Sequence, residues 1–399
     1  MALVGARVID GSGAAPIANA AVLVENGRIV RVGPAASVDI PAGAARVDLS
    51  GRTIIPGLIN AHGHLGHGDR SLPVYDQIIQ QLKTYQRFGV TTVVALGDDG
   101  VESVRVSEEN TKSPLDRPRL FAAGARATAK TPEDARRVIA DRHAQRVHFI
   151  KTGMNGNAND MSPETYAALI DEAHKRKLRV AAHLANLADA RGLVDAGLDV
   201  IGHSIRDQDA DAAFIAELKR RDVGYIPTLT RDLSVFQYQS TPDYVGDPFF
   251  LRGMPLYAPQ IARVTDPALH EKTKNNPGAV RAKVGFDQAL RNLKLLSDGG
   301  VLIAMGTDSG TGTGRWQGYF EHVEMELMVK AGMTPMQTLV AATGNAAKVM
   351  GIDGDLGTLQ PGKRADFVVL SADPLADIRN TRAIESVWID GRSEEHQLR

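Results

Sequence analysis

Short runs of alternating apolar and polar residues occupy the first part of the chain. Four such runs are visible, at residues 3–10, 20–25, 28–32 and 45–49. A period of two predicts half-buried β-strands, and the Asn-Gly pair at residues 26–27 is typical of a hairpin turn. The same alternation of apolar and polar residues occurs again at residues 365–370 and 384–390. We therefore predict a small composite β-sandwich built from residues 1–52 and 357–399.

Between these ends, short apolar runs alternate with helical patterns such as that of residues 132–146. Eight runs are interpreted as strands, at residues 58–61, 91–96, 120–124, 148–152, 180–184, 200–204, 225–229 and 301–307. Eight strands in a βα alternation are the number that a TIM barrel requires. We predict an α/β protein whose residues 53–356 form a TIM-type (β/α)8 barrel, with its active site at the carboxyl ends of the strands.

One connection, at about residues 230–279, is much longer than the others. It is rich in aromatic residues, proline and glycine. A segment of this length in a compact domain is usually functional. We expect a lid-like insertion over the mouth of the barrel, whose aromatic residues form a wall of the substrate pocket, and a contact between subunits is the alternative.

Composition and charge limit the classes of function. The chain has 399 residues, of which 43% are hydrophobic and 23% charged, values typical of globular proteins rather than of disordered chains or membrane spans. Lysine and arginine number 46 against 47 aspartates and glutamates, so no excess charge indicates nucleic acid or a membrane as partner. We expect a small-molecule or dipeptide-like substrate, and a homo-oligomer.

The chain contains no cysteine, which excludes disulfides, thiolate metal ligands and a cysteine nucleophile. Any metal would have to be held by histidine, carboxylate or modified lysine. The residues after Met1 show no signal-peptide pattern, so we expect a cytoplasmic protein unless a signal has been removed.

Two histidines, His62 and His64, end the first predicted barrel strand in the phrase IIPGLINAHGHLGH. Residues i and i+2 of a strand face the same side. Neutral imidazole is the commonest side-chain ligand of zinc-like metals. The pair therefore predicts a metal site, with a chance His-X-His tripeptide as the alternative.

Four further polar residues end other predicted strands, namely Lys151, His183, His203 and Asp308. A barrel places its catalytic groups at these positions. Taken singly, each residue could have a purely structural role instead of binding metal. The lysine could form a salt bridge, a histidine could be hydrogen-bonded in the core, and the aspartate could cap a turn. Together with the histidine pair they predict a metal centre.

Lys151 requires an explanation of its own. A desolvated ammonium beside divalent cations is strongly disfavoured. Carboxylation of the amine by carbon dioxide removes this conflict, because the product is a carbamate anion that can bind metal. We therefore expect Lys151 to be carboxylated.

These residues carry a resemblance to a known family. The phrases PGLINAHGH, FIKTG, AAHL, IGHS and GTDSG, with the stretch GDLGTLQPGKRADFVVL at residues 354–370, resemble the amidohydrolase superfamily. The resemblance covers essentially the whole chain. It favours the binuclear branch with a carboxylated lysine, near imidazolonepropionase-like, prolidase-like and ochratoxin-hydrolysing enzymes.

The resemblance implies two divalent metal ions in each chain, of the zinc type. It implies that His62, His64 and Asp308 bind one ion and His183 and His203 the other, with carboxylated Lys151 and a hydroxide bridging them. The hydroxide would attack the carbonyl, and Asp308 would act as general acid/base. The expected activity is hydrolysis of a peptide-like amide bond in a dipeptide or N-acyl amino acid.

Three residues next to the predicted ligands are candidates for substrate contacts. Arg231 follows the seventh strand and could hold a carboxylate through two parallel hydrogen bonds. Asn155 lies just past Lys151, and His67 just past the histidine pair. For each of the three, a solvated loop residue is the alternative.

Two other functions remain open at this point. One is a mononuclear deaminase, or a cyclic amide or imidazolone hydrolase, of the same superfamily, although such a site does not require a carboxylated lysine. The other is a non-catalytic scaffold, against which the intact set of ligand-type residues argues.

Overall fold

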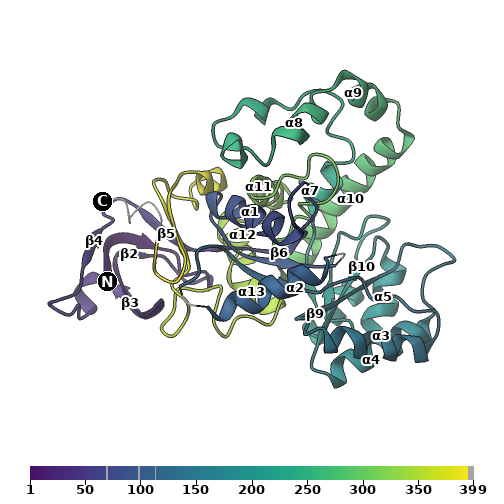
Figure 1. Ribbon diagram of the computed structural model, residues 1–399, viewed down its shortest axis with the longest axis horizontal. Helices are drawn as coiled ribbons and strands as arrows, with labels where there is room; N and C mark the ends of the chain where they lie inside the picture. The colour runs from purple at the N-terminus through teal and green to yellow at the C-terminus, as the bar shows by residue number, and fades with distance from the viewer. Residues whose placement is uncertain (69–70, 98, 113, 394–399) are drawn as a thin grey trace.

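The structure is a computed structural model that describes residues 1–68, 71–97, 99–112 and 114–393. The end of the predicted composite domain, residues 394–399, lies outside the described residues. The described elements form a β domain made by both chain ends and a barrel of parallel strands with helices around it (Figure 1). No helix in the described part is long and apolar enough to cross a lipid bilayer.

Both ends of the chain contribute to one seven-stranded sheet of the described structure. Its strands are, in spatial order, β15 (Ile384–Trp388), β14 (Phe367–Leu370), β5 (Thr53–Pro56), β1 (Ala2–Val8), β2 (Ile17–Glu25) and β3 (Arg28–Pro34), with β4 (Arg46–Asp48) also paired to β1. The antiparallel ladder of β14 and β5 joins the two ends. Their apolar side chains, including the stacked rings of Phe367 and Trp388, form a core of their own. The predicted contribution of both chain ends to one β domain is confirmed, whereas the exact domain limits remain a prediction.

Eight parallel strands of the described chain form the barrel. They are β6 (Leu58–Gly63), β7 (Val90–Ala95), β8 (Arg119–Ala122), β9 (Phe149–Gly153), β10 (Arg179–His183), β11 (Val200–Ile201), β12 (Gly224–Tyr225) and β13 (Leu302–Ile303). Continuous ladders run from β6 to β8 and from β9 to β13. Backbone hydrogen bonds close both seams, from His148 N to Ala122 O (2.9 Å) and from Ala61 N to Met305 O (3.0 Å). The predicted TIM-type barrel is therefore present, although β11, β12 and β13 are shorter than the sequence suggests.

Helices follow most of the barrel strands (Figure 1). They are α1 (Val74–Arg87), α2 (Val101–Glu108), α3 (Pro132–Ala144), α4 (Pro163–Lys175), α5 (Leu187–Asp195), α6 (Ala212–Arg220), α7 (Leu229–Leu233), α10 (Pro277–Asp298), α11 (Tyr319–Lys330), α12 (Pro335–Ala341) and α13 (Gly344–Val349). A short 3-10 turn, η2 (Glu109–Thr111), follows α2, whereas η1 (Ala35–Ser37) and η5 (Ile378–Arg382) lie between strands of the β domain. Side chains decide where several of them begin. Thr131 and Ser162 each accept a hydrogen bond from the backbone N–H three residues on, and a proline follows each of them.

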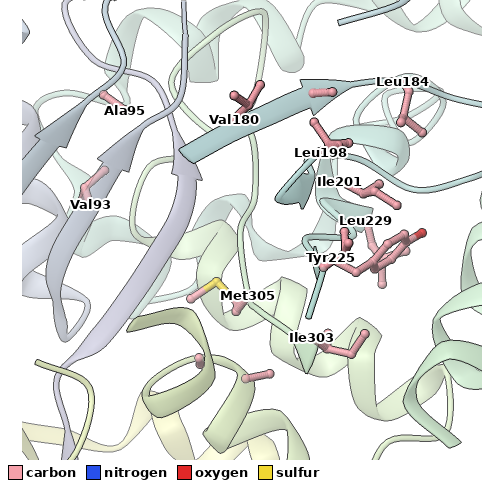
Figure 2. Packing of buried hydrophobic residues seen from close by; sticks show 14 of the residues in the cluster. Val93, Ala95, Val180, Leu184, Leu198, Ile201, Tyr225, Leu229, Ile303 and Met305 are labelled. Atoms are coloured by element: carbon pink, nitrogen blue, oxygen red, sulfur yellow. The ribbon is translucent and has the colours of Figure 1, made fainter. Parts of the chain in front are cut away.

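The barrel strands bury side chains on both faces, as parallel strands do. Val180, Ile201 and Tyr225 belong to the large core shared with the surrounding helices (Figure 2). Their neighbours Ala181 and Val200 belong to a second cluster, which includes residues of α13. The strands' amino ends are thus occupied by packing, and polar chemistry is left to their carboxyl ends.

The long connection after β12 is helical rather than irregular. Beyond α7 it contains η3 (Asp243–Gly246), η4 (Phe250–Gly253), α8 (Ala258–Val264) and α9 (Pro267–Lys274), and it ends in α10. In Figure 1, α8 and α9 lie at the outer end of this insertion. Its aromatic side chains pack with one another and with the start of α11, in a cluster that includes Tyr238, Phe250, Tyr257, Trp316 and Tyr319. These rings form a core for the insertion itself.

A buried arginine connects the barrel to the β domain. Arg119, at the start of β8, pairs with Asp366 Oδ2 at 3.1 Å and with Asp390 Oδ1 at 2.5 Å. The two aspartates adjoin β14 and β15, and all three side chains are at most 4% exposed. Removing one partner of a buried ion pair leaves uncompensated charge, which costs far more than loss of a surface pair.

We expect Arg119→Met to lower the free energy of unfolding by about 3–5 kcal/mol, because buried Asp366 loses its cation and Asp390 keeps only its contact with Arg364. Urea titration of wild type and variant measures the loss. The matched control is Arg220→Met on α6, where the arginine side chain is 64% exposed and the expected loss is about 0.5 kcal/mol or less. Equal losses in the two variants would show that the Arg119 pairs do not stabilise the fold.

Candidate metal centre

The six ligand-type residues of the predicted metal centre line one cavity of about 230 Å³. They are His62, His64, Lys151, His183, His203 and Asp308. Leu96, Arg126, Arg231 and Thr311 complete the described lining. Residues more than 240 positions apart in the sequence thus meet, because each follows or ends a strand of the same barrel.

The strand β6 presents His62 and His64 to the cavity. His62 Nδ1 lies 2.8 Å from the carbonyl oxygen of Gly202. A carbonyl can only accept, so Nδ1 carries the hydrogen and Nε2 keeps its lone pair for another partner. Burial lowers the pKa of His62 well below its ordinary value, and the charge of Lys151 lowers it further. His62 is therefore a neutral imidazole, the form that binds metal.

His183 and His203 face the same space from β10 and from the loop after β11. Their ring centroids are 4.4 Å apart, and the His203 ring lies 4.6 Å from that of His62. Burial lowers the pKa of His183 to about 3 and that of His203 well below its ordinary value. A hydrogen bond of 2.8 Å between His203 Nδ1 and Thr228 Oγ1 fixes the His203 ring.

Asp308 completes this group from the loop after β13. Its backbone has φ +56°, in the left-handed region that residues other than glycine rarely adopt. One carboxylate oxygen lies 2.7 Å from His64 Nε2, and the other accepts a hydrogen bond of 2.5 Å from Arg315 Nη1. Burial alone would raise the pKa of Asp308, but His64, His62 and Arg315 hold it well below its usual range. Asp308 is therefore a carboxylate.

Lys151 points from β9 into this cluster of imidazoles. Its side chain is 4% exposed, and Nζ lies 3.1 Å from His62 Nε2. Glycines make room for it, because a Cβ on Gly97 would lie 2.5 Å from Lys151 Cγ and one on Gly202 would lie 3.1 Å from Nζ. The lysine head is thus packed closely without being exposed to solvent.

The chemistry of this donor set fits divalent metal ions. Potential ligand atoms of His62, His203 and Asp308 all lie within 4.8 Å of one another. His64 Nδ1 is buried and has no hydrogen-bond partner among the described residues, with Asp99 Oδ1 3.9 Å away. Neutral imidazoles with a carboxylate are typical ligands of zinc-like ions.

The predicted substrate contacts differ in their surroundings. Arg231 lines the cavity, where its guanidinium pairs with Asp232 Oδ1 at 2.9 Å. Asn155 and His67 are exposed and are not among the lining residues. Asn155 instead donates its backbone N–H to Asp160 at 2.9 Å and closes a turn. The roles of all three in substrate binding remain predictions.

Several residues at this site were not predicted from the sequence. Arg126 lies four residues after β8, where the rule that selected the other strand-end residues would have found it. Arg315 lies in the loop between β13 and α11 and carries no such signal. Glu324 of α11 accepts hydrogen bonds of 2.7 Å from the backbone N–H groups of Leu229 and Thr230, next to Thr228.

The insertion does not supply the cavity wall that its aromatic residues suggested. Of residues 230–279, only Arg231 is among the described lining residues. The rings are used in the insertion's own core, where Trp316 Nε1 donates to the hydroxyls of Tyr238 and Tyr244 at 3.1 Å. The expectation of an aromatic wall over the site was therefore wrong, whereas the role of the insertion as a lid remains a prediction.

Three known proteins illustrate what this chain is similar to. It is 25% identical to ochratoxinase from Aspergillus niger over 290 residues, which cover 69% of this chain and only 52% of that enzyme. It is 26% identical to imidazolonepropionase from Ralstonia nicotianae over 388 residues, with 92% and 90% coverage. A crystal structure from Bifidobacterium longum, provisionally described as a prolidase, superposes with a TM-score of 0.80 at 28% identity and covers 98% of this chain and 94% of its own.

The sequence model of the amidohydrolase family matches residues 53–215 and 287–393. The matched residues make up more than half of the chain and include every residue of the predicted metal centre. The unmatched stretch, residues 216–286, contains most of the insertion between β12 and α10. The chain belongs to the amidohydrolase family.

Proposed function

We propose that this protein is a binuclear metal-dependent hydrolase that cleaves a peptide-like amide bond in a dipeptide or an N-acyl amino acid. The convergence of four histidines, an aspartate and a buried lysine on one cavity is the observation that carries the proposal. The names of its relatives support amide chemistry, because they include an ochratoxinase and a provisional prolidase.

In this proposal the ligands divide into two groups. His62, His64 and Asp308 would hold one divalent ion, most simply zinc, and His183 and His203 the other, with carboxylated Lys151 bound to both. When bound, the ions would acidify a water molecule and polarise the scissile carbonyl. The protein's own contribution is to keep His62 and His203 neutral by burial and their rings fixed through Gly202 and Thr228.

The Lys151 ammonium would first release a proton to give the amine, and carboxylation would then form a bond from Nζ to the carbon of carbon dioxide with loss of a second proton to solvent. The amine would become a carbamate anion in place of a cation. The charge balance of the cavity supports this change, because Lys151, Arg126 and Arg231 face Asp308 in the described lining. A carbamate would reverse one of these positive charges where metal cations bind.

Asp308 would move the proton. One of its oxygens would accept a proton from the attacking water and deliver it to the amide nitrogen as the C–N bond breaks, so that an amine and a carboxylate leave. His64 and Arg315 fix the carboxylate from two sides, at 2.7 Å and 2.5 Å. Their contacts, with the left-handed backbone of Asp308, hold the group that must reach both water and leaving nitrogen.

A cyclic amide or imidazolone hydrolase is the second candidate. It is favoured by the similarity to imidazolonepropionase over 92% of this chain. A buried lysine that can carry carbon dioxide favours the binuclear reading instead. A substrate screen with both kinds of amide distinguishes the two.

We expect hydrolysis of dipeptides or N-acyl amino acids that is lost with a chelator and restored by zinc, because water must be activated by bound metal. Elemental analysis of the active enzyme should give two divalent ions per chain. Hydrolysis restricted to cyclic amides would favour the second candidate. One ion per chain at full activity would contradict the binuclear proposal.

We expect Lys151→Met to lose metal and activity, since the variant cannot form a carbamate. Enzyme equilibrated with ¹³C-bicarbonate should show a carbamate resonance by NMR that is absent from Lys151→Met. Lys175→Met is the matched control, because that lysine side chain is 60% exposed on α4, and it should keep both metal and resonance. A metal-loaded, active wild-type enzyme without the resonance would refute the carbamate.

We expect Asp308→Asn to lower kcat by about 10²–10⁴-fold, because an amide oxygen can still bind metal but the group cannot carry a proton. Metal content, measured on the same preparation, should stay largely unchanged. Asp195→Asn, at a side chain that is 73% exposed, controls for the substitution itself. A rate within a few-fold of wild type would assign the proton transfer to another residue.

A further inference from the structure

The cavity has more positive charge than its metal-ligand set explains. Arg126 and Arg231 both line it, and Arg315 bonds to Asp308 at its edge. Metal ions would add further positive charge. Because an arginine cannot lose its proton in a protein, an arginine beside a metal centre needs an anionic partner.

Arg231, the residue that the sequence favours as a carboxylate binder, already has anionic partners. Its Nη1 lies 2.9 Å from Asp232 Oδ1, and its Nε lies 3.9 Å from Asp308 Oδ2. Asp232 is buried and also pairs with Arg206. Arg315 is likewise paired, through its hydrogen bond to Asp308. Each of the two guanidiniums therefore already has an anionic partner in the protein.

Arg126 is different from both. Its Nε and Nη2 are buried and have no hydrogen-bond partner, and no ion pair joins it to any other described residue. It lines the same cavity as His183 of β10, and its positive charge is among the causes, after burial and Lys151, that lower the pKa of that histidine. The residue as a whole is partly exposed and lines the cavity, so its guanidinium can meet a ligand there. Because unpaired N–H groups are costly, an anionic partner from the cavity would be favourable.

The backbone around Arg126 leaves space for this side chain. A Cβ on Gly153, at the end of β9, would lie 2.5 Å from Arg126 Nη2 and 2.6 Å from His183 Cβ. The flexible end of Arg126 could shift, but a Cβ would also lie 2.6 Å from the carbonyl oxygen of His183, so only glycine fits at this position, and its lack of a side chain leaves room for the guanidinium. The position is therefore fixed by packing against β9 and β10, and not by an ion pair.

We propose that Arg126 binds the free carboxylate of the substrate's amino-acid portion and thereby selects dipeptides and N-acyl amino acids over their amides. The proposal rests on the proposed function, which it deepens by naming the group that recognises the substrate. A guanidinium matches a carboxylate with two parallel N–H···O bonds, which adds geometric selection to charge. Substrates without the carboxylate would leave Arg126 unpaired beside bound metal, and this penalty excludes them.

The test compares Arg126→Ala and Arg126→Gln with wild type on a panel of dipeptides and N-acetyl amino acids, each as free acid and as carboxamide. Loss of a charge-assisted bond to a carboxylate should lower kcat/KM on the free acids by about 10- to 100-fold. On the carboxamides the loss should be much smaller. Arg231→Ala is the comparison within the cavity, and Arg137→Ala, at a side chain that is 68% exposed on α3, is the control outside it.

A binding measurement keeps this test separate from turnover. In thermal-shift titrations, L-methionine should stabilise wild type more than 3-(methylthio)propylamine does, since the two compounds differ only in the carboxylate. The difference should disappear in Arg126→Gln. Metal content and the thermal midpoint without additive establish that each variant is folded.

The outcomes separate the two proposals. Equal losses on acids and carboxamides, or an acid-specific loss in Arg231→Ala and not in the Arg126 variants, would overturn the assignment of Arg126. Wild type that cleaves no member of the panel would overturn the proposed amide hydrolase. The L-methionine titration then decides on Arg126 alone, and an unchanged difference in Arg126→Gln would reject it.

Discussion

The seam between the first and last barrel strands is the constraint on which the site depends. The carbonyl oxygen of His62 accepts hydrogen bonds from Thr307 N at 3.1 Å and from Asp308 N at 2.7 Å, and His64 N donates to Ser309 O at 2.9 Å. These bonds close the barrel and, in the same contacts, bring an aspartate from the end of the chain's barrel region against the two histidines at its start. Fold closure and site assembly are therefore one event, and a shift of the seam by one residue would separate Asp308 from both imidazoles.

A buried carboxyl group stabilises this seam from behind. Glu321 of α11 accepts hydrogen bonds from Asn60 Nδ2 at 2.6 Å and from Thr307 Oγ1 at 2.7 Å. It also accepts one from the hydroxyl of Ser309 at 3.0 Å. Burial raises the pKa of Glu321 to about 7, although these hydrogen bonds oppose the rise. A polar network of this kind, fully bonded and enclosed, fixes one arrangement of the strands, because any other would leave buried groups unpaired.

Charge is distributed unevenly around the centre, and this distribution gives the site its chemical character. Burial and nearby cations lower the pKa values of His62, His183 and His203, whereas His64, His62 and Arg315 hold the pKa of Asp308 well below its usual range. Burial would also lower the pKa of His64, but its hydrogen bond to Asp308 and the charge of that carboxylate raise it. Arg231 is balanced by Asp232, and Arg126 has no such balance among the described residues. A site of this composition offers lone pairs to a metal ion and has one cation without a partner among the described residues, a combination suited to a substrate that brings its own negative charge.

The sequence by itself determined the architecture and the identities of the six ligand-type residues. Both are local properties: a period of two at the chain ends, a βα alternation between them, and a polar residue at a strand's carboxyl end, which parallel strands must bring to one mouth. The contacts that polar and aromatic side chains make in the folded protein could not be predicted from the sequence. Arg231 bonds to its neighbour Asp232, Asn155 closes a turn, and the insertion's aromatic residues pack on α11. Which partner a long side chain contacts depends on the distances between residues that are far apart in the sequence, and those distances are set only when the barrel closes. For that reason only the tertiary structure distinguished Arg126 as the cavity arginine that has no partner among the described residues.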